Sequence, residues 1–297
     1  MNHNENPLTF SVSIVLTFWR KLLKRGMFSP NSMKFFSKKN QNIYKNYKKK
    51  PNNEKFINLI QKGIIPRPYY ALGLLLAARQ AYDLGFKEIK VIELGCHNFD
   101  GLIDIEQYVN DIKKIININI KVFGFTLKSG LPKYKENSFN RLYRWQPGSY
   151  KFDKKNNYNN LKLSKIFFGD VKNTIPKFLK KYKPTFSNSP IGFVISDLDY
   201  YKSTKIGLNL FKLSSNNYLP RTYIYFDDHS FSSIDEGERK AITEFNKTSK
   251  NKISDIHELA EQLSIYFNKW IFLGKRLKVI SYFKHKMFNK KITSFLD

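Results

Sequence analysis

The sequence predicts an α/β fold in which a doubly wound, mostly parallel sheet carries helices on both faces. Short apolar runs alternate along the chain with longer segments rich in helix-forming residues. That alternation is typical of a parallel sheet built from right-handed β-α-β crossovers. The apolar runs at 191–195 and 223–226 are followed by turn residues, as expected of buried parallel strands.

The first half of the predicted sheet contains two strands and two helices. A helix is expected over residues 71–84, because a run of good helix formers ends there at Gly85. Strands are expected at 90–94 and 121–125, with the second helix at 102–115 between them. This order is one β-α-β unit of a parallel sheet.

The second half of the predicted sheet continues the same alternation. It comprises strands at 165–168, 191–195 and 223–226, helices ending near 181 and spanning 202–213 and 234–247, and apolar stretches at 265–273 and 277–283. A polar and aromatic connection, residues 126–160, precedes these elements. Connections of this length within a domain are often lids or binding loops.

The turn after the first strand reads E-L-G-C-H-N-F-D-G over residues 93–101. A strand, a glycine-containing turn and a helix form the arrangement that lets the backbone approach a nucleotide-like ligand. Only Gly95 and Gly101 supply glycine here, so this signal is weak by itself.

Four carboxylates follow two of the predicted strands. Asp197 and Asp199 come after one apolar run, and Asp227 and Asp228 come after the next. Ligands bind at the carboxyl ends of strands in open parallel sheets, so both pairs are expected at one edge. Like charges at close range repel unless a cation intervenes, which predicts a divalent-metal site with one carboxylate as a base. The alternative is that these aspartates are ordinary turn residues and helix N-caps.

Composition restricts the partners and the compartment. The 297 residues carry a net charge of +28, because 43 lysines and nine arginines outnumber 24 acidic residues. Lysine, asparagine and isoleucine are abundant throughout, and no Arg-rich helix or aromatic RNA-binding motif occurs, so a nucleic-acid partner is disfavoured. Cys96 is the only cysteine, which excludes an internal disulfide and favours a reducing cytoplasm.

Residues 1–50 are expected to form a basic, mobile arm ahead of a folded domain at 51–297. Lysine and asparagine dominate residues 34–50. The apolar run at 8–19 is too short to span a membrane and lacks the charge order of a signal peptide. A short helix at a membrane surface is the alternative for this run. The oligomeric state is not indicated by the sequence.

Several motifs in combination resemble the class I S-adenosylmethionine-dependent methyltransferases. More narrowly, D-x-D-x-Y-x-S-T and the later D-D resemble the macrocin O-methyltransferase-like group, which is metal dependent and acts on sugar hydroxyls. Further segments resemble an uncharacterised bacterial branch of these enzymes, namely R-P-Y-Y-A-L-G-L, L-Y-R-W-Q-P-G, P-I-G-F-V-I-S-D-L-D-Y-Y-K-S-T, L-P-R-T-Y-I-Y-F-D-D and F-K-H-K-M-F-N. The resemblance covers residues 64–290 approximately.

The resemblance implies a Rossmann-like methyltransferase that uses S-adenosylmethionine and Mg²⁺ or Mn²⁺ to methylate a hydroxyl of a sugar or glycan precursor. It implies that Asp199 is the general base. The metal ligands that it implies are Asp197, Asp227 and Asp228. The residues that it places at the cofactor are Glu93, Gly95, Cys96, Gly101, Asp170 and Val171, with Asp170 facing the adenine.

Two departures from the family pattern support a second hypothesis. His97, Asn98 and Phe99 replace part of the glycine-rich loop, and the bulky Phe99 is expected to crowd the methionine end of the cofactor. Thr126 stands where an acid usually grips the ribose hydroxyls, and threonine cannot make the charged bidentate contact. The second hypothesis is therefore a non-catalytic binding or regulatory protein that retains the methyltransferase fold.

Overall fold

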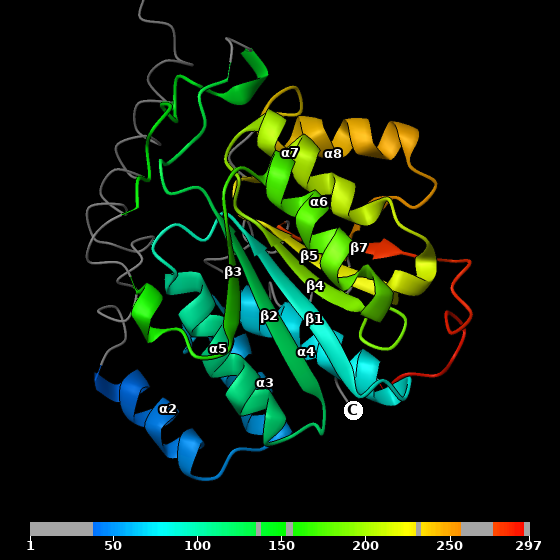
Figure 1. The fold of residues 1–297 in the computed structure, drawn as a ribbon. Coiled ribbons are helices and arrows are strands. Elements are labelled where there is room, and N and C mark those ends of the chain that lie inside the picture. The colour runs from blue at the N-terminus through cyan, green and yellow to red at the C-terminus, as the bar shows by residue number, and fades with distance from the viewer. Residues whose placement is uncertain (1–37, 135–137, 153–156, 230–232, 257–275, 294–297) are drawn as a thin grey trace, which may run out of the picture.

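A seven-stranded sheet with strand order β3-β2-β1-β4-β5-β7-β6 forms the centre of the computed structural model (Figure 1). The structure describes residues 38–134, 138–152, 157–229, 233–256 and 276–293. The strands are β1 (Glu88–Leu94), β2 (Asn119–Thr126), β3 (Ser164–Phe168), β4 (Ile191–Ser196), β5 (Tyr218–Phe226), β6 (Ile253–Asp255) and β7 (Leu277–Ser281). Strands β1 to β5 pair in parallel, and β7 is antiparallel to both β5 and β6. The predicted doubly wound, mostly parallel sheet is confirmed.

Helices cover both faces of the sheet. Figure 1 shows α3 (Asn53–Gln61), α4 (Pro68–Asp83) and α5 (Asp100–Lys113) on one face, and α6 (Val171–Tyr182), α7 (Tyr201–Gly207) and α8 (Gly237–Thr248) on the other. Each layer of helices encloses its own hydrophobic cluster against the sheet. No helix of the described residues is long and apolar enough to cross a membrane.

Strands β1, β2, β4 and β5 are largely buried on both faces, which explains their mostly apolar sequences, whereas β3 and β6 lie at the two edges of the sheet and are more exposed. In β1, the side chain of Val91 joins the cluster under α4 and α5, while Ile92 joins the cluster under α6 to α8. Helix α4 approaches the sheet closely at Gly73, where an added Cβ would lie 2.4 Å from a ring carbon of Phe193. Successive side chains of a strand therefore pack alternately against the helices on the two faces of the sheet.

The structure differs from the sequence prediction at several element boundaries. Strand β5 begins at Tyr218, five residues before the predicted start at Tyr223, and includes Pro220. The helix predicted over 202–213 ends as α-helix at Gly207 and continues as a 3₁₀ turn. Strand β6 has only three residues and was not predicted. The apolar stretch at 265–273 lies outside the described residues.

Helix α2 (Lys38–Lys49) corrects part of the predicted mobile arm. Its Tyr47 is 4% exposed, and the Tyr47 ring stacks between the rings of Tyr44 and Phe56 at centroid distances of 6.0 and 5.7 Å. The hydroxyl of Tyr44 donates a hydrogen bond of 2.9 Å to Asp111 on α5. Two tyrosines therefore attach a lysine-rich helix to the domain. The apolar run at 8–19 lies outside the described residues.

The Tyr47→Ala variant tests this attachment. We expect a loss of about 2–3 kcal/mol of unfolding free energy, because a buried aromatic side chain is removed from a packed cluster. The matched control is Tyr82→Ala, since Tyr82 is 53% exposed on α4. Denaturant unfolding curves of both variants supply the comparison. Equal stabilities of the two variants would show that α2 does not pack on the domain.

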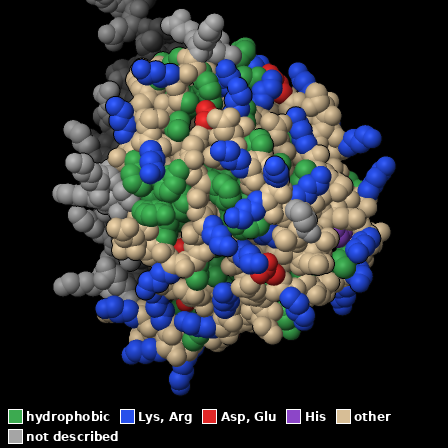
Figure 2. Space-filling view, in the orientation of Figure 1, with side chains coloured by type: hydrophobic (Ala, Val, Ile, Leu, Met, Phe, Trp, Pro, Cys, Tyr) green, Lys and Arg blue, Asp and Glu red, His purple; other side chains and the backbone are tan. Residues whose placement is uncertain are grey.

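Lysine and arginine side chains are spread over the face seen in Figure 2, among neutral and hydrophobic side chains. They are not gathered on this face into a single stripe of the kind that binds a nucleic-acid backbone.

Candidate active site

The two acid pairs lie side by side at the carboxyl edge of the sheet. Asp197 and Asp199 follow β4, Asp227 and Asp228 follow β5, and these strands are neighbours. The backbone N–H of Asp227 donates to the carbonyl of Ser196 at 3.0 Å, which links the two turns. The structure therefore brings the four predicted aspartates together.

Burial and mutual repulsion set the electrostatics of these acids. Burial raises the pKa of Asp197 well above its usual value, and the carboxylate of Asp227 adds to the effect. Burial also raises the pKa of Asp199, and the nearby charge of Asp228 raises it further. The pKa of Asp228 is raised for the same reason, although Arg141 opposes the shift. The cluster consequently favours protonation or a cationic partner.

A fifth acid, Glu238 at the start of α8, belongs to the cluster and was not predicted. Its carboxylate accepts hydrogen bonds from the Ser196 hydroxyl at 3.2 Å and from the Asp228 backbone N–H at 2.9 Å. Burial, followed by the charge of Asp228, raises its pKa well above the usual value. From sequence alone, Glu238 is one of several polar residues in the first turn of a helix, where acids are common.

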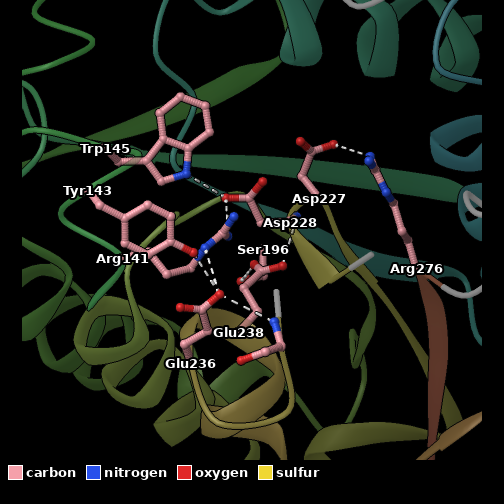
Figure 3. A network of polar contacts seen from close by, with 10 residues as sticks. Arg141, Tyr143, Trp145, Ser196, Asp227, Asp228, Glu236, Glu238 and Arg276 are labelled. Atoms are coloured by element: carbon pink, nitrogen blue, oxygen red, sulfur yellow. Dashed lines mark hydrogen bonds and ion pairs between the residues drawn. The ribbon is translucent and has the colours of Figure 1, made fainter. Parts of the chain in front are cut away.

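Arginine side chains pair with two of the aspartates (Figure 3). Arg141 is fully buried, and its Nη1 lies 3.3 Å from Oδ2 of Asp228. The indole N–H of Trp145 donates to the same Asp228 oxygen at 3.0 Å. On the other side, Arg276 donates to Oδ1 of Asp227 at 3.0 Å. The long connection 126–160 thus delivers Arg141 and Trp145 to the acids.

The predicted metal ligands do not form a ligand set. Within the described ranges, no group of three or more His, Cys, Asp or Glu side chains is arranged to hold a metal ion. Asp227 and Asp228 are hydrogen-bonded to different arginines, on opposite sides of the cluster in Figure 3. The described arrangement therefore does not fit the Mg²⁺ or Mn²⁺ site implied by the resemblance.

His229 follows the second acid pair but is not placed as an acid-base group. Burial lowers its pKa to about 3, with smaller contributions from Lys278 and Arg239. It lines a cavity of about 320 Å³ between α8 and strands β6 and β7. An imidazole with so low a pKa is neutral at neutral pH, so it is not a cationic acid there.

The turn after β1 has the backbone geometry predicted from its glycines. Gly95 has φ of 94°, and a Cβ there would lie 1.7 Å from the backbone oxygen of Asp197. A Cβ at Gly101 would lie 2.2 Å from Oε1 of Glu93. Position 95 therefore requires glycine, and the turn after β1 is in direct contact with the first acid turn, whereas a side chain at 101 would meet the carboxylate of Glu93.

Glu93 presents an unsatisfied carboxylate oxygen at this turn. The side chain is buried, and Oε2 has no hydrogen-bond partner among the described residues. Burial raises its pKa to about 7, against the opposing charge of Arg67. A buried acceptor without a partner is rare in folded proteins. A cationic donor such as the ammonium group of an amino-acid moiety would satisfy this oxygen, which fits the predicted cofactor.

Phe99 occupies a conformation that usually belongs to glycine. Its φ is 66°, in the left-handed region, so the turn keeps its shape despite the bulky residue. The ring is 1% exposed and packs against Phe152, Tyr158 and Phe168 at centroid distances of 5.4, 5.5 and 6.5 Å. The aromatic part of the long connection therefore covers the turn and holds the Phe99 side chain.

Backbone strain is concentrated around these two turns. Among the residues that the structure describes, the non-glycine residues with φ in the left-handed region are Arg67, Phe99, Arg141, Tyr150 and Asp199. Tyr150 packs against Trp145 and His97, at centroid distances of 5.5 and 5.2 Å, and so lies between the acids and the turn after β1. Strained residues of this kind persist where the surrounding structure holds them, most often at functional sites.

The remaining predicted cofactor residues have structural contacts of their own. The thiol of Cys96 is buried and donates to the carbonyl of Phe125 at 3.2 Å, and burial raises its pKa, so it is not a reactive thiolate. Asp170 caps α6 by accepting from the backbone N–H of Lys172 at 2.8 Å. The side chain of Val171 packs in the core under α6 to α8.

The raised pKa of Glu93 predicts a pH dependence of stability. An acid with a folded-state pKa near 7 and an unfolded value near 4.5 binds a proton only in the folded state between these values. The unfolding free energy is therefore highest, as far as Glu93 contributes to it, below pH 4.5. It falls by an amount on the order of 3 kcal/mol as the pH rises from 4.5 to about 7. The Glu93→Gln variant should lack this loss. Denaturant unfolding at pH 5 and pH 8 measures it, and equal pH dependence in both proteins would contradict it.

Comparison with solved structures finds methyltransferases at low sequence identity. No protein-family model matches this sequence, and no curated protein matches it significantly. The O-methyltransferase NovP is a similar structure, with 13% identity, a TM-score of 0.47, and coverage of 71% of this chain and 78% of NovP. CalS11, a TDP-rhamnose 3'-O-methyltransferase, is similar at 17% identity and a TM-score of 0.39, over 73% of this chain and 88% of CalS11. At these identities the similarity concerns the fold alone.

Proposed function

We propose that this protein is an S-adenosylmethionine-dependent O-methyltransferase that acts on a hydroxyl of a small molecule, such as a sugar or glycan precursor. The proposal is supported chiefly by the contact between the turn after β1 and the turn that carries Asp199. The backbone N–H of Asp197 donates to the carbonyl of Leu94 at 2.8 Å, and Gly95 lies against the backbone of Asp197. A ligand in the first turn would therefore lie beside the acids.

Residues of the first turn are suited to hold the cofactor. S-adenosylmethionine, when bound, supplies a methyl group on a positively charged sulfur. Glu93 offers its unsatisfied oxygen to the ammonium group, and Gly95 and Gly101 allow close backbone approach. Cys96 lies within this turn, and Asp170 and Val171 at the start of α6 would border the adenine.

Asp199 is suited to act as the general base. A hydroxyl is a poor nucleophile, and removal of its proton during attack accelerates the reaction. Burial and the neighbouring Asp228 raise the pKa of Asp199, which makes its ionised carboxylate a stronger base. Asp199 is 8% exposed, so the proton is transferred in a largely water-free environment. No step in this proposal passes through a metal.

A methyl-transfer assay tests the proposed function. The full chain is incubated with S-adenosylmethionine labelled in the methyl group and with a panel of free and nucleotide-linked sugars. We expect label in at least one acceptor, in a product that is stable to mild base as an ether is. Absence of label from every hydroxyl acceptor, together with label in an amine or a carboxylate acceptor tested alongside, would contradict methylation of a hydroxyl.

The aromatic cover of the first turn favours a second candidate function, that of a non-catalytic binding protein. Phe152 and Tyr158 pack on Phe99, and Thr126 at the end of β2 is buried and uncharged. Ligand binding without methyl transfer to any acceptor would favour this second candidate. Methyl transfer would exclude it.

A further inference from the structure

Arg141 is the most unusual side chain at the carboxyl edge of the sheet. It is a fully buried arginine, a state that is rare in folded proteins unless the guanidinium is paired. Its Nη1 lies 3.3 Å from Oδ2 of Asp228, and its Nε lies 3.7 Å from Oε1 of Glu236. One guanidinium thus bridges an acid of the β5 turn and an acid at the start of α8.

This bridging is what a divalent cation does in a carboxylate site. Figure 3 shows the guanidinium of Arg141 between Asp228 and Glu236, and Arg276 facing Asp227 from the other side. Asp228 also receives the indole N–H of Trp145 on the oxygen that faces Arg141. Oδ2 of Asp228 is therefore already used by two donors from the chain.

The segment around Arg141 is anchored on both sides, so its guanidinium is held in place. Before it, the side-chain oxygen of Asn140 accepts from the backbone N–H of Lys202 at 3.0 Å. After it, the Tyr143 hydroxyl donates to Glu236 at 2.8 Å. The Tyr200 hydroxyl donates to the carbonyl of Trp145 at 2.9 Å. These contacts tie the connection to α7, α8 and the acid turn.

Arg276 completes the arrangement at the other end of the cluster. Its Nη1 donates to Oδ1 of Asp227 at 3.0 Å and to the hydroxyl of Tyr225 at 2.9 Å. The Tyr225 hydroxyl in turn donates to the same Asp227 oxygen at 3.1 Å. Both acids of the second pair therefore have a cation from the chain within hydrogen-bond distance.

We propose that Arg141 and Arg276 are the resident cations of this site and take the place of a divalent metal. The site then binds neither Mg²⁺ nor Mn²⁺, and Arg141 is a positioning residue that orients Asp228 beside Asp199. The statement about Asp199 rests on the proposed O-methyltransferase function, whereas the statement about metal binding does not.

Metal titrations of the full chain test the proposal. We expect the melting midpoint of the wild type to stay within about 1 °C at ~10 mM MnCl₂ or MgCl₂, because an unbound ion adds no stability. The Arg141→Met variant keeps an unbranched, flexible side chain, which is shorter than that of arginine, and removes its charge. Its melting midpoint should rise with the logarithm of the Mn²⁺ concentration, and calorimetry should show a binding isotherm that the wild type lacks. The Arg221→Met variant is the matched control, since Arg221 stacks on Phe288 and contacts none of the four aspartates.

Specific results would overturn the proposal. Stoichiometric Mn²⁺ binding by the wild type, lost in Asp228→Asn, would show that the cluster is a metal site. A folded Arg141→Met protein that binds no Mn²⁺ would show that Arg141 does not take the place of a metal. Should Arg141→Met fail to fold, Arg276→Met serves instead, because its partner Asp227 is 38% exposed, and it is expected to gain Mn²⁺ binding. If the wild type binds no Mn²⁺ and Arg141→Met binds it, but no methyl transfer is found, only the proposed function is contradicted.

Discussion

Replacing Asp199 by asparagine is expected to reduce methyl transfer by about 10²–10⁴-fold, the usual effect of removing a positioned general base. The variant keeps the size of the side chain and removes the group that accepts the proton from the acceptor hydroxyl. Stability should be maintained or increased, because one carboxyl is removed from a buried cluster whose members raise each other's pKa. The measurement is kcat with labelled S-adenosylmethionine, alongside a thermal melt.

The matched control for this prediction is Asp83→Asn at the far end of α4, which should retain full activity. Activity of the wild type should also rise with pH as Asp199 ionises, and that rise should be absent from the residual activity of Asp199→Asn. Wild-type activity in Asp199→Asn would show that another group, or water, takes the proton.

Replacing Phe99 by alanine is expected to destabilise the fold by about 3–5 kcal/mol, the usual cost of removing a packed phenylalanine side chain. The ring is buried among Phe152 and Tyr158 of the long connection and Phe168 of β3, beside the turn after β1. The Phe99→Gly variant should be less destabilised than Phe99→Ala, by about 1 kcal/mol, because glycine adopts the left-handed conformation without strain. This order is the reverse of the usual one.

Denaturant unfolding of both Phe99 variants measures this order. The Phe283→Ala variant is the control, since Phe283 is 71% exposed and should change stability little. A Phe99→Gly protein less stable than Phe99→Ala would show that position 99 does not hold a left-handed backbone in solution.

The sheet was predictable because its strands carry a strong local signal. Strands β2, β4 and β5 each contain an apolar run before turn residues, and β1 is apolar except at Glu88, Lys90 and Glu93; burial on both faces favours such sequences. Strand β6 lacks this signal, since two of its three residues are exposed and only pairing with β7 makes it a strand. The sequence did not predict that α2 packs on the domain, because α2 contains only two tyrosines among many lysines. In the structure Tyr47 is nevertheless buried.

The acids of the site were predictable, and their counter-ions were not. Aspartates directly after strands are assigned to one edge by topology alone, so Asp199 and Asp228 could be placed together. Arg141 reaches them from the long connection, directly after a short 3₁₀ helix, and Arg276 reaches them from directly before the antiparallel strand β7. Only tertiary structure brings these arginines to the acids. The sequence analysis expected Phe99 to crowd the cofactor. It did not predict the cluster of aromatic side chains against which the Phe99 ring packs.

Calorimetric titration of the full chain with S-adenosylmethionine at pH 7 tests the central claim most directly. The account predicts one binding site per chain, and affinity at least about tenfold weaker in Glu93→Gln, since a charged hydrogen bond contributes about 1.5–3 kcal/mol. Addition of Mg²⁺ should leave both affinities unchanged. Absence of binding heat and of any thermal shift in the wild type would contradict the claim, and so would equal affinity in Glu93→Gln.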